Sequence, residues 1–202
     1  MPGAYTNPLR DLRKRHSAEW AVEPAEVVIA AGKLVAHELR QEWKWLGYEL
    51  IRFHREAFNG LSQDDLIDLS KDVASWYAVD GLGTILVGPL WLKGRLFDAV
   101  VTSWSLDENR WLRRLSLVAT VGLNLKGGKG PGDAGRTLPI CRQLASDRDD
   151  MVEKALSWAL RTLAKRDRPA VVDFIAECDG LLASRVKREV RNLLKFGTKA
   201  KQ

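Results

Sequence analysis

An indole and a carboxylate stand four residues apart in the stretch SWYAVDGLG, which spans residues 75–83. On a helix, side chains at this spacing lie one above the other, so Trp76 and Asp80 would point at the same target. Two structural interpretations compete with a functional one: Trp76 belongs to the core, and Asp80 is the N-cap of a helix that begins at DGLGTILVGPLW. Taken alone, the pair favours the structural interpretations.

A second group with chemical potential is the arginine cluster in DENRWLRRLSL. Arg110 and Arg114 are four residues apart, with Arg113 beside them, near the start of a helix for which Asp107 is the expected cap. Arginine binds phosphate through two parallel hydrogen bonds, and helix N-termini attract anions. The alternative is a set of arginines paired with acidic neighbours.

A third group lies in MVEKALSWALRTLAKR, where Lys154, Trp158, Arg161 and Lys165 recur at steps of four, three and four residues. The stripe holds three cations and an indole, beside an apolar stripe that would face the core. Aromatic side chains interleaved with cations are typical of nucleic-acid-binding grooves. We therefore expect Trp158 to be a partly exposed platform, with burial in the core as the alternative.

The elements that carry these groups are predicted to be helices. Apolar residues recur at helical spacing along nearly the whole chain, and no segment alternates with period two between hairpin turns. We expect two helices in residues 24–58 and another in residues 62–77, with Ser62 as N-cap and Asp65 three residues later. The sequence predicts an all-α fold.

Glycine and proline predict where these helices are interrupted. The expected breaks are Gly60, residues 81–83, Gly88–Pro89, Gly94, Pro139, Pro169 and Gly180. The stretch LKGGKGPGDAGRT, residues 125–137, predicts a flexible loop, and residues 197–202 predict a basic tail. The loop is not a phosphate-binding P-loop, because no strand precedes it and the GK[ST] ending is missing.

A faint repeat links three windows that start at Asn109, Asp149 and Ala183, with offsets of 40 and 34 residues. In each window a cation follows an aliphatic residue by two positions, which makes Arg114, Lys154 and Arg188 equivalent and predicts that they face the same way. This period is typical of HEAT-like helix pairs. We predict one domain over residues 1–202, an α-solenoid of stacked antiparallel helix pairs with a concave basic face. The alternative is that any amphipathic helix has cations near its apolar edge.

Composition limits the class of protein and its partners. The 202 residues are 46% apolar, enough for a sizeable core, and residues 181–202 hold seven cations against one anion, which accounts for the whole net charge of +6. A neutral body with a basic end suits a polyanionic partner, although a solvated basic tail has the same charge.

Cysteine and histidine usage excludes several kinds of site. Cys141 and Cys178 lack a metal-ligand spacing and are expected to be buried thiols in the reducing bacterial cytoplasm. His16, His37 and His54 are scattered, so we expect no metal and no catalytic triad. No nucleotide fingerprint occurs, and no cofactor is expected. The chain also lacks a signal peptide and an apolar window long enough for a membrane span, so no membrane association is expected.

Three motifs together resemble the DNA alkylation repair family of AlkD-like alkylpurine DNA glycosylases, which are built from HEAT-like repeats. The motifs are SWYAVD, ENRWLRRLSLV and VEKALSWALRTLAKRDRPAVVDFI, and the likeness is good from about Trp76 to Phe196 and weaker before. Two departures are Tyr77, where many members have an acidic residue, and an N-terminal part that looks shorter. By match of motif, the resemblance implies catalytic roles for Asp80, Trp76, Trp158 and Arg114, with Arg113 as the alternative arginine.

The resemblance implies hydrolysis of the N-glycosidic bond of cationic N3- and N7-alkylated purines in double-stranded DNA, without an obligate protein partner. Eight cations, which all lie in the second half of the chain, are expected to bind DNA: Arg110, Arg113, Lys154, Arg161, Lys165, Arg188, Arg191 and Lys195. Two other classes stay open, a non-catalytic HEAT-like DNA-binding or damage-sensing protein and a protein–protein scaffold. The scaffold predicts no salt-sensitive binding to DNA.

Overall fold

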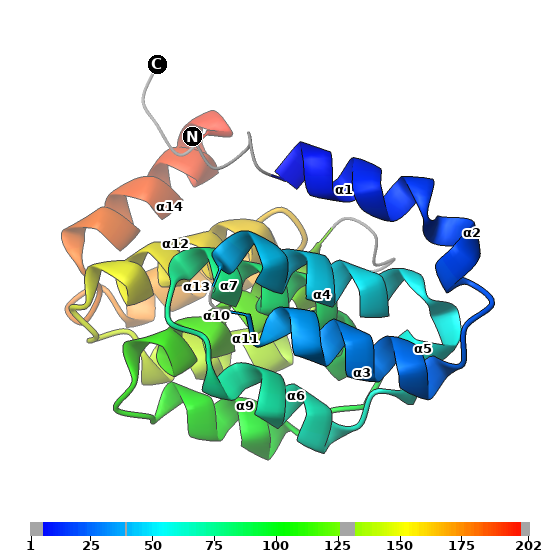
Figure 1. Ribbon diagram of the computed structural model, residues 1–202. Coiled ribbons are helices and arrows are strands. Elements are labelled where there is room, and N and C mark those ends of the chain that lie inside the picture. Colours follow the sequence, from blue (N-terminus) through cyan, green and yellow to red (C-terminus); the bar gives the residue numbers. More distant parts are fainter. Residues whose placement is uncertain (1–5, 39, 126–131, 199–202) are drawn as a thin grey trace. The chain divides into compact units, whose positions relative to one another are not determined.

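The computed structural model describes residues 6–38, 40–125 and 132–198, and in these ranges every regular element is a helix (Figure 1). The predicted all-α class is confirmed. The chain forms two compact units, Met1–Leu96 and Phe97–Gln202, and the single domain over residues 1–202 stays a prediction. No helix in the described ranges is long and apolar enough to cross a membrane.

Helix α4 is the centre of the first unit, because α1, α3, α5 and α7 all pack against it. Its buried face includes Leu46, Tyr48 and Ile51. The elements of this unit are α1 (Thr6–Arg15), α2 (Ser17–Trp20), α3 (Ala25–Ala36), α4 (Gln41–Phe53), α5 (Arg55–Gly60), α6 (Gln63–Lys71), α7 (Trp76–Leu82), the π-helix η1 (Gly83–Val87) and α8 (Gly88–Leu92).

Helices α3 and α4 approach each other closely through two glycines. A Cβ atom on Gly47 would lie 2.4 Å from the carbonyl oxygen of Gly32, and one on Gly32 would lie 2.5 Å from Cγ1 of Ile51. Real Cβ atoms do not approach other atoms this closely, so the packing requires glycine at both positions.

Residues 24–58 were expected to form two helices, and the structure has three. His54 has an extended backbone conformation, and its Nδ1 accepts a hydrogen bond from the Ala57 amide at 3.0 Å. This side-chain cap ends α4 and starts α5, because it satisfies an amide that has no partner within the helix.

The expected helix over residues 62–77 is also divided. Its start is confirmed, since Ser62 and Asp65 form a capping box, but α6 ends at Lys71. Ser75 is extended and its Oγ accepts from the Ala78 amide at 3.3 Å, which makes it the N-cap of α7. Trp76 and Asp80 therefore lie at the start of a new helix rather than at the end of the old one.

The breaks expected at residues 81–83 and at Gly88–Pro89 were wrong. Gly83 and Gly88 both have right-handed helical dihedral angles, so the chain continues through η1 into α8. The buried side chains of Leu82, Leu86 and Leu90 explain why the helix continues, since packing outweighs the low helix propensity of glycine. Asp80 lies inside α7, so its interpretation as an N-cap was wrong as well.

Other breaks have mixed outcomes. Gly60 ends α5, Gly94 has a φ of 70° after α8, and Gly180 lies between two helices, as expected. Pro169 stands in the first turn of a helix, where its missing N–H costs nothing. Pro139 is inside a helix, so the break expected there was wrong.

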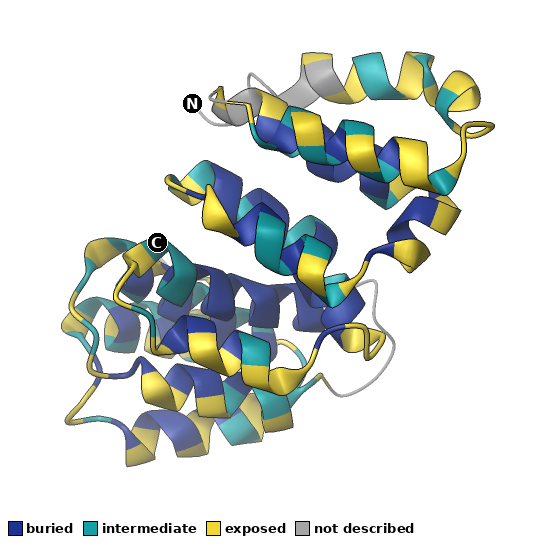
Figure 2. Ribbon diagram, turned by 60° about the horizontal axis from the view of Figure 1, so that its bottom comes forward, coloured by how far each residue is buried: buried dark blue, intermediate teal, exposed yellow. Residues whose placement is uncertain are grey.

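The second unit consists of two layers of helices. Helices α10, α12 and α14 pack side by side in one layer, while α9, α11 and α13 contact them from the other. Helix α10 is buried from Arg114 to Asn124, whereas its neighbours show one buried face each (Figure 2). The bounds are α9 (Asp98–Ser105), α10 (Arg110–Asn124), α11 (Ala134–Gln143), α12 (Asp150–Leu163), α13 (Arg168–Glu177) and α14 (Ser184–Phe196).

The three windows of the predicted repeat coincide with the three helices of one layer. Their first residues, Asn109, Asp149 and Ala183, are the N-cap positions of α10, α12 and α14. Polar contacts between elements recur at a similar separation, such as Arg113–Asp147 at 34 residues and Arg142–Glu177 at 35. The second unit is therefore a solenoid-like stack of helix pairs.

Two predicted boundaries in this unit need correction. Asp107 is not the cap of α10, because the Asn109 Oδ1 accepts from the Trp111 amide at 2.9 Å. The loop expected over residues 125–137 is shorter, since α11 already begins at Ala134. Its central part, residues 126–131, and the last part of the basic tail, residues 199–202, lie outside the described residues.

Substituting alanine for Gly47 should destabilise the first unit. The added methyl group would meet the α3 backbone, and overpacking of this kind costs about 1–3 kcal/mol. Chemical denaturation followed by circular dichroism measures the loss. Gly60→Ala is the matched control, because its nearest contact would be 3.8 Å away; equal stabilities of the two variants would contradict the close packing.

Candidate functional site

Trp76 and Asp80 occupy one face of α7. Trp76 is the first residue of the helix and is 39% exposed, while Asp80 lies one turn later and is half-buried. The carbonyl of Asp80 accepts from the Thr84 hydroxyl at 2.6 Å, at the junction with η1. π-Helical turns within α-helices occur frequently at functional sites. Trp76 is thus not a core residue, and the structure keeps an indole and a carboxylate at helical spacing.

Neighbouring aromatic residues support this face of α7. The Tyr77 ring meets the Trp76 ring edge-on, with centroids 5.8 Å apart, and packs against the Trp45 ring at 5.0 Å. Trp45 belongs to none of the sequence motifs that predict a site. The one hint in the sequence is that Tyr77 and Gly81, which directly follow Trp76 and Asp80, are also four residues apart and so share a helix face.

The arginine cluster at the start of α10 is held by protein acceptors. Arg113 donates through Nε to Asp147 at 2.7 Å, and through Nη1 to the carbonyl oxygens of Asp107 and Glu108 at 2.9 and 2.7 Å. Arg110 is exposed and lies 3.5 Å from an Asp149 oxygen. Arg110 and Arg113 are therefore both paired with acidic neighbours, which is the alternative interpretation of this cluster.

Arg114 differs from its two neighbours. Its side chain is buried, with the residue 5% exposed, and its Nη1 donates to the carbonyl oxygen of Met151. Lys154 and Arg188, at the equivalent repeat positions, are exposed. The three cations thus occupy equivalent positions along their helices, but Arg114 is buried where Lys154 and Arg188 are exposed.

The four residues of the stripe predicted on α12 differ in how far they are exposed. Lys154 and Lys165 are exposed, and Trp158 is half-buried, as expected of a partly exposed platform. Lys154 lies 2.6 Å from Asp150, which also pairs with Arg185. These two cations, Lys154 first, hold the pKa of Asp150 below its usual value.

Arg161 lies against α14 instead of joining the exposed lysines. Its Nε donates to the Ser157 hydroxyl at 3.2 Å and lies 3.8 Å from Glu189 on α14, whose carboxylate also accepts from Ser157 at 2.8 Å. Burial lowers the pKa of the Arg161 guanidinium, while Glu189 opposes that shift. Arg161 thus helps to join two helices of the layer.

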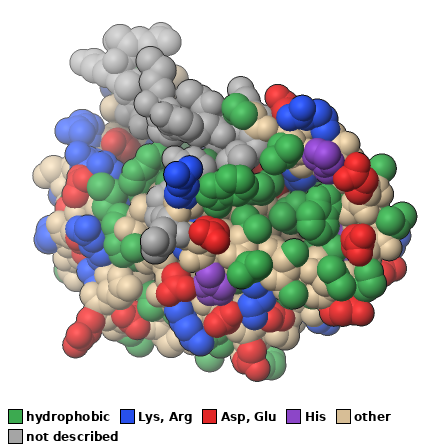
Figure 3. Space-filling model, in the orientation of Figure 1, with side chains coloured by type: hydrophobic (Ala, Val, Ile, Leu, Met, Phe, Trp, Pro, Cys, Tyr) green, Lys and Arg blue, Asp and Glu red, His purple; other side chains and the backbone are tan. Residues whose placement is uncertain are grey.

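Helix α14 carries three predicted DNA-binding cations at helical spacing, Arg188, Arg191 and Lys195, and all three are exposed. Arg191 pairs with Asp179. Within the described part of the chain, Lys165, Arg188 and Lys195 form no ion pair, and we call them the unpaired cations. Figure 3 shows how closely acidic and basic side chains alternate elsewhere on one face.

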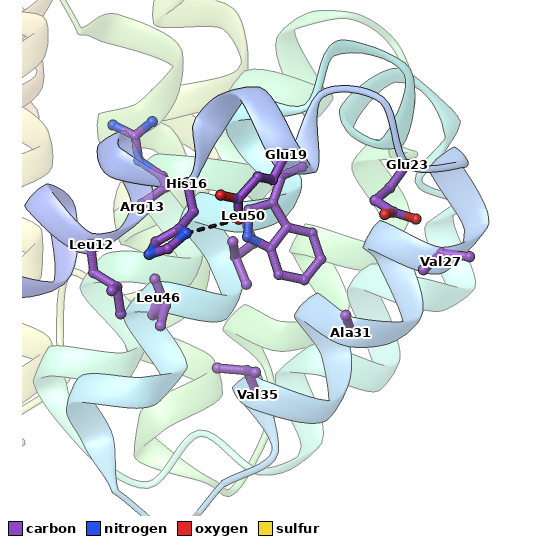
Figure 4. Close-up of a pocket in the computed structure, with 11 residues that line it drawn as sticks. Leu12, Arg13, His16, Glu19, Glu23, Val27, Ala31, Val35, Leu46 and Leu50 are labelled. Atoms are coloured by element: carbon purple, nitrogen blue, oxygen red, sulfur yellow. Dashed lines mark hydrogen bonds and ion pairs between the residues drawn. The ribbon is translucent and has the colours of Figure 1, made fainter.

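A pocket of about 650 Å³ lies in the first unit, between α1–α2 and α3–α4 (Figure 4). Apolar side chains such as Leu12, Val35 and Leu46 line most of it, together with a His16–Glu19 pair at 2.8 Å. None of the predicted site residues lines it. Across the described ranges, no group of three or more His, Cys, Asp or Glu residues could hold a metal ion.

Comparison with known families agrees with the motif resemblance. The family described as DNA alkylation repair enzyme matches residues 1–194. The chain belongs to this family. No curated protein matches the chain closely enough to count as a relative.

The DNA alkylation repair family match covers both units of the chain. It includes α1–α6, where the motif resemblance was weak, and every predicted site residue except Lys195. A role in repair of alkylated DNA therefore applies to the chain as a whole, and DNA is its expected substrate.

Replacement of Arg113 by alanine should reduce stability. The change would leave the half-buried Asp147 carboxylate and two carbonyl groups without their donor, which costs about 1–3 kcal/mol. Urea denaturation measures the effect, with exposed Arg188→Ala as the control. A variant as stable as the control would contradict a structural role for Arg113.

Proposed function

We propose that this chain is a DNA glycosylase that hydrolyses the N-glycosidic bond of cationic N3- and N7-alkylated purines in duplex DNA and leaves an abasic site. Family membership supports action on alkylated DNA, and the motif resemblance supports the glycosylase reaction. The observation that carries the proposal is the pair on α7, an exposed indole one turn from a half-buried carboxylate.

The reaction needs little from a general acid. An alkylated purine is already positively charged, so when the bond from the anomeric carbon to N9 breaks, its electron pair neutralises the leaving base. Positive charge develops on the sugar, water adds to the anomeric carbon, and Asp80 takes the proton that water loses. A carboxylate near that carbon stabilises the transition state more than the ground state.

The electrostatic attraction between the Asp80 carboxylate and the positive charge on the sugar is large enough to accelerate the reaction. Opposite unit charges about 4 Å apart gain on the order of 4 kcal/mol at an effective dielectric constant of ~20. This free energy corresponds to roughly a thousandfold in rate.

The other site residues keep the roles that the resemblance implies. Trp76 and Trp158 offer electron-rich faces to the cationic sugar and exclude water. The motif resemblance assigns the contact with the DNA backbone near the lesion to Arg114, with Arg113 as the alternative; Arg114 is buried, and three acceptors hold Arg113.

We also propose that the architecture is of the HEAT-like kind. Support comes from polar contacts between elements whose separation is near the predicted repeat length in both units, such as 32 residues for Lys33–Asp65 and 39 for Arg110–Asp149. The concave basic surface and the cytoplasmic location stay predictions.

Replacing Asp80 by asparagine tests the chemistry. The variant keeps the shape of the side chain but loses its charge, so we expect release of N7-methylguanine from methylated duplex DNA to fall roughly a thousandfold. Single-turnover rates and DNA affinity are measured together, and the affinity should not change. Asp173→Asn, an exposed change on α13, is the control.

Two results would change the assignment. If the native chain bound duplex DNA but released no alkylated base, the non-catalytic DNA-binding protein would replace the glycosylase. If Asp80→Asn kept the native rate, another residue would have to carry the catalytic role.

The unpaired cations should dominate DNA affinity, because binding them to phosphate breaks no ion pair. In a Lys165→Gln, Arg188→Gln, Lys195→Gln variant, we expect weaker binding and a smaller salt dependence. The slope of log K against log salt should fall by roughly 0.9 for each phosphate that the variant no longer neutralises. Titrations of duplex DNA at several salt concentrations measure both.

A second triple variant controls for net charge. It carries Lys71→Gln, Arg142→Gln and Lys187→Gln, which remove the same charge from cations that pair with Asp68, Glu177 and Asp179. An equal weakening in the two triple variants would show that net charge alone matters, against a role for the unpaired cations.

A further inference from the structure

The face of α7 next to Trp76 and Asp80 is occupied by another aromatic side chain. Tyr77 and Gly81 lie one turn apart, and the indole of Trp45 on α4 contacts both. A Cβ atom on Gly81 would be 2.7 Å from Cε3 of Trp45, and the Trp45 and Tyr77 ring centroids are 5.0 Å apart with the planes at 39°. Trp45 therefore fills a notch that only glycine leaves open.

The orientation of Trp45 is set by a buried carboxylate. Its Nε1 donates to Glu49 at 3.2 Å, one turn along α4, and Glu49 is 4% exposed. The same carboxylate accepts from Arg10 Nε at 2.9 Å and Arg13 Nε at 3.2 Å, both on α1. A buried carboxylate with three donors is held in one position, so the indole that donates to it is held as well.

We propose that Trp45, held by Glu49, is a positioning residue that sets the rotation of α7 about its axis. This inference rests on the proposed glycosylase function. When α7 rotates, the pair Tyr77–Gly81 and the pair Trp76–Asp80 move together. Because Trp45 fills the notch at Tyr77 and Gly81, it also fixes the direction in which Trp76 and Asp80 point. Misplacement of a catalytic group by about 1 Å can cost a hundredfold in rate.

The test is Gly81→Ala, which inserts a methyl group between α7 and Trp45. We expect the single-turnover rate of N7-methylguanine release to fall 10- to 100-fold, while duplex affinity stays within twofold because no predicted DNA-binding cation lies on α7. Gly60→Ala, whose added carbon would meet only Ile29 at 3.8 Å, should keep the native rate. Circular dichroism establishes that each variant is folded at the assay temperature.

Two further variants separate positioning from general damage. In an Asp80→Asn background, Gly81→Ala should lower the residual rate by a smaller factor than in the native background, because the carboxylate is gone and only Trp76 is left to be misplaced. Adding Trp45→Phe to Gly81→Ala should restore part of the rate, because the smaller ring leaves room for the methyl group.

The outcomes distinguish the two proposals. A native chain that releases no alkylated base overturns the glycosylase function, and the positioning role with it. An active native chain with an unchanged Gly81→Ala rate overturns only the positioning role, and so does a loss that persists in full in the Asp80→Asn background.

Discussion

The first unit depends on how closely other helices approach α4. On one side Gly47 allows contact with the backbone of α3, and on another Gly81 of α7 admits the ring of Trp45. Neither contact tolerates an added methyl group. The elements that carry Trp76 and Asp80 are consequently positioned by close contact, which is the kind of support that a site with strict geometric demands requires.

In the second unit, electrostatic interactions serve both the fold and the proposed function. Five of the eight predicted DNA-binding cations already have an acidic partner, and three of them, Arg110, Arg113 and Arg161, have it in the next helix pair. The contacts of these three arginines join successive helix pairs, so the three side chains bind phosphate only with a loss of stability. Under the proposed function, Lys165, Arg188 and Lys195 are the predicted DNA-binding cations that bind phosphate without breaking an ion pair, and we expect them to contribute most to DNA affinity.

Helix starts that depend only on neighbouring residues in the sequence were predicted well. Ser62 with Asp65 identified the start of α6, and the repeat windows begin at the N-cap positions of α10, α12 and α14. The breaks expected at residues 81–83 were wrong, because buried leucines keep the chain helical there. Arg161 was expected beside the exposed lysines, yet a partner on another helix turned it inward. Such long-range contacts leave no local pattern.

The sequence by itself determined the helical class, the repeat, the family and the four-residue step between Trp76 and Asp80. These follow from periodicity and motif, which are properties of neighbours along the chain. Only the tertiary structure decided that Asp80 lies inside a helix and is not its cap, that Arg114 is buried, and that Trp45 packs behind the candidate site. The physical reason is that burial and pairing depend on residues distant in the sequence, whose contacts form only when the helices pack.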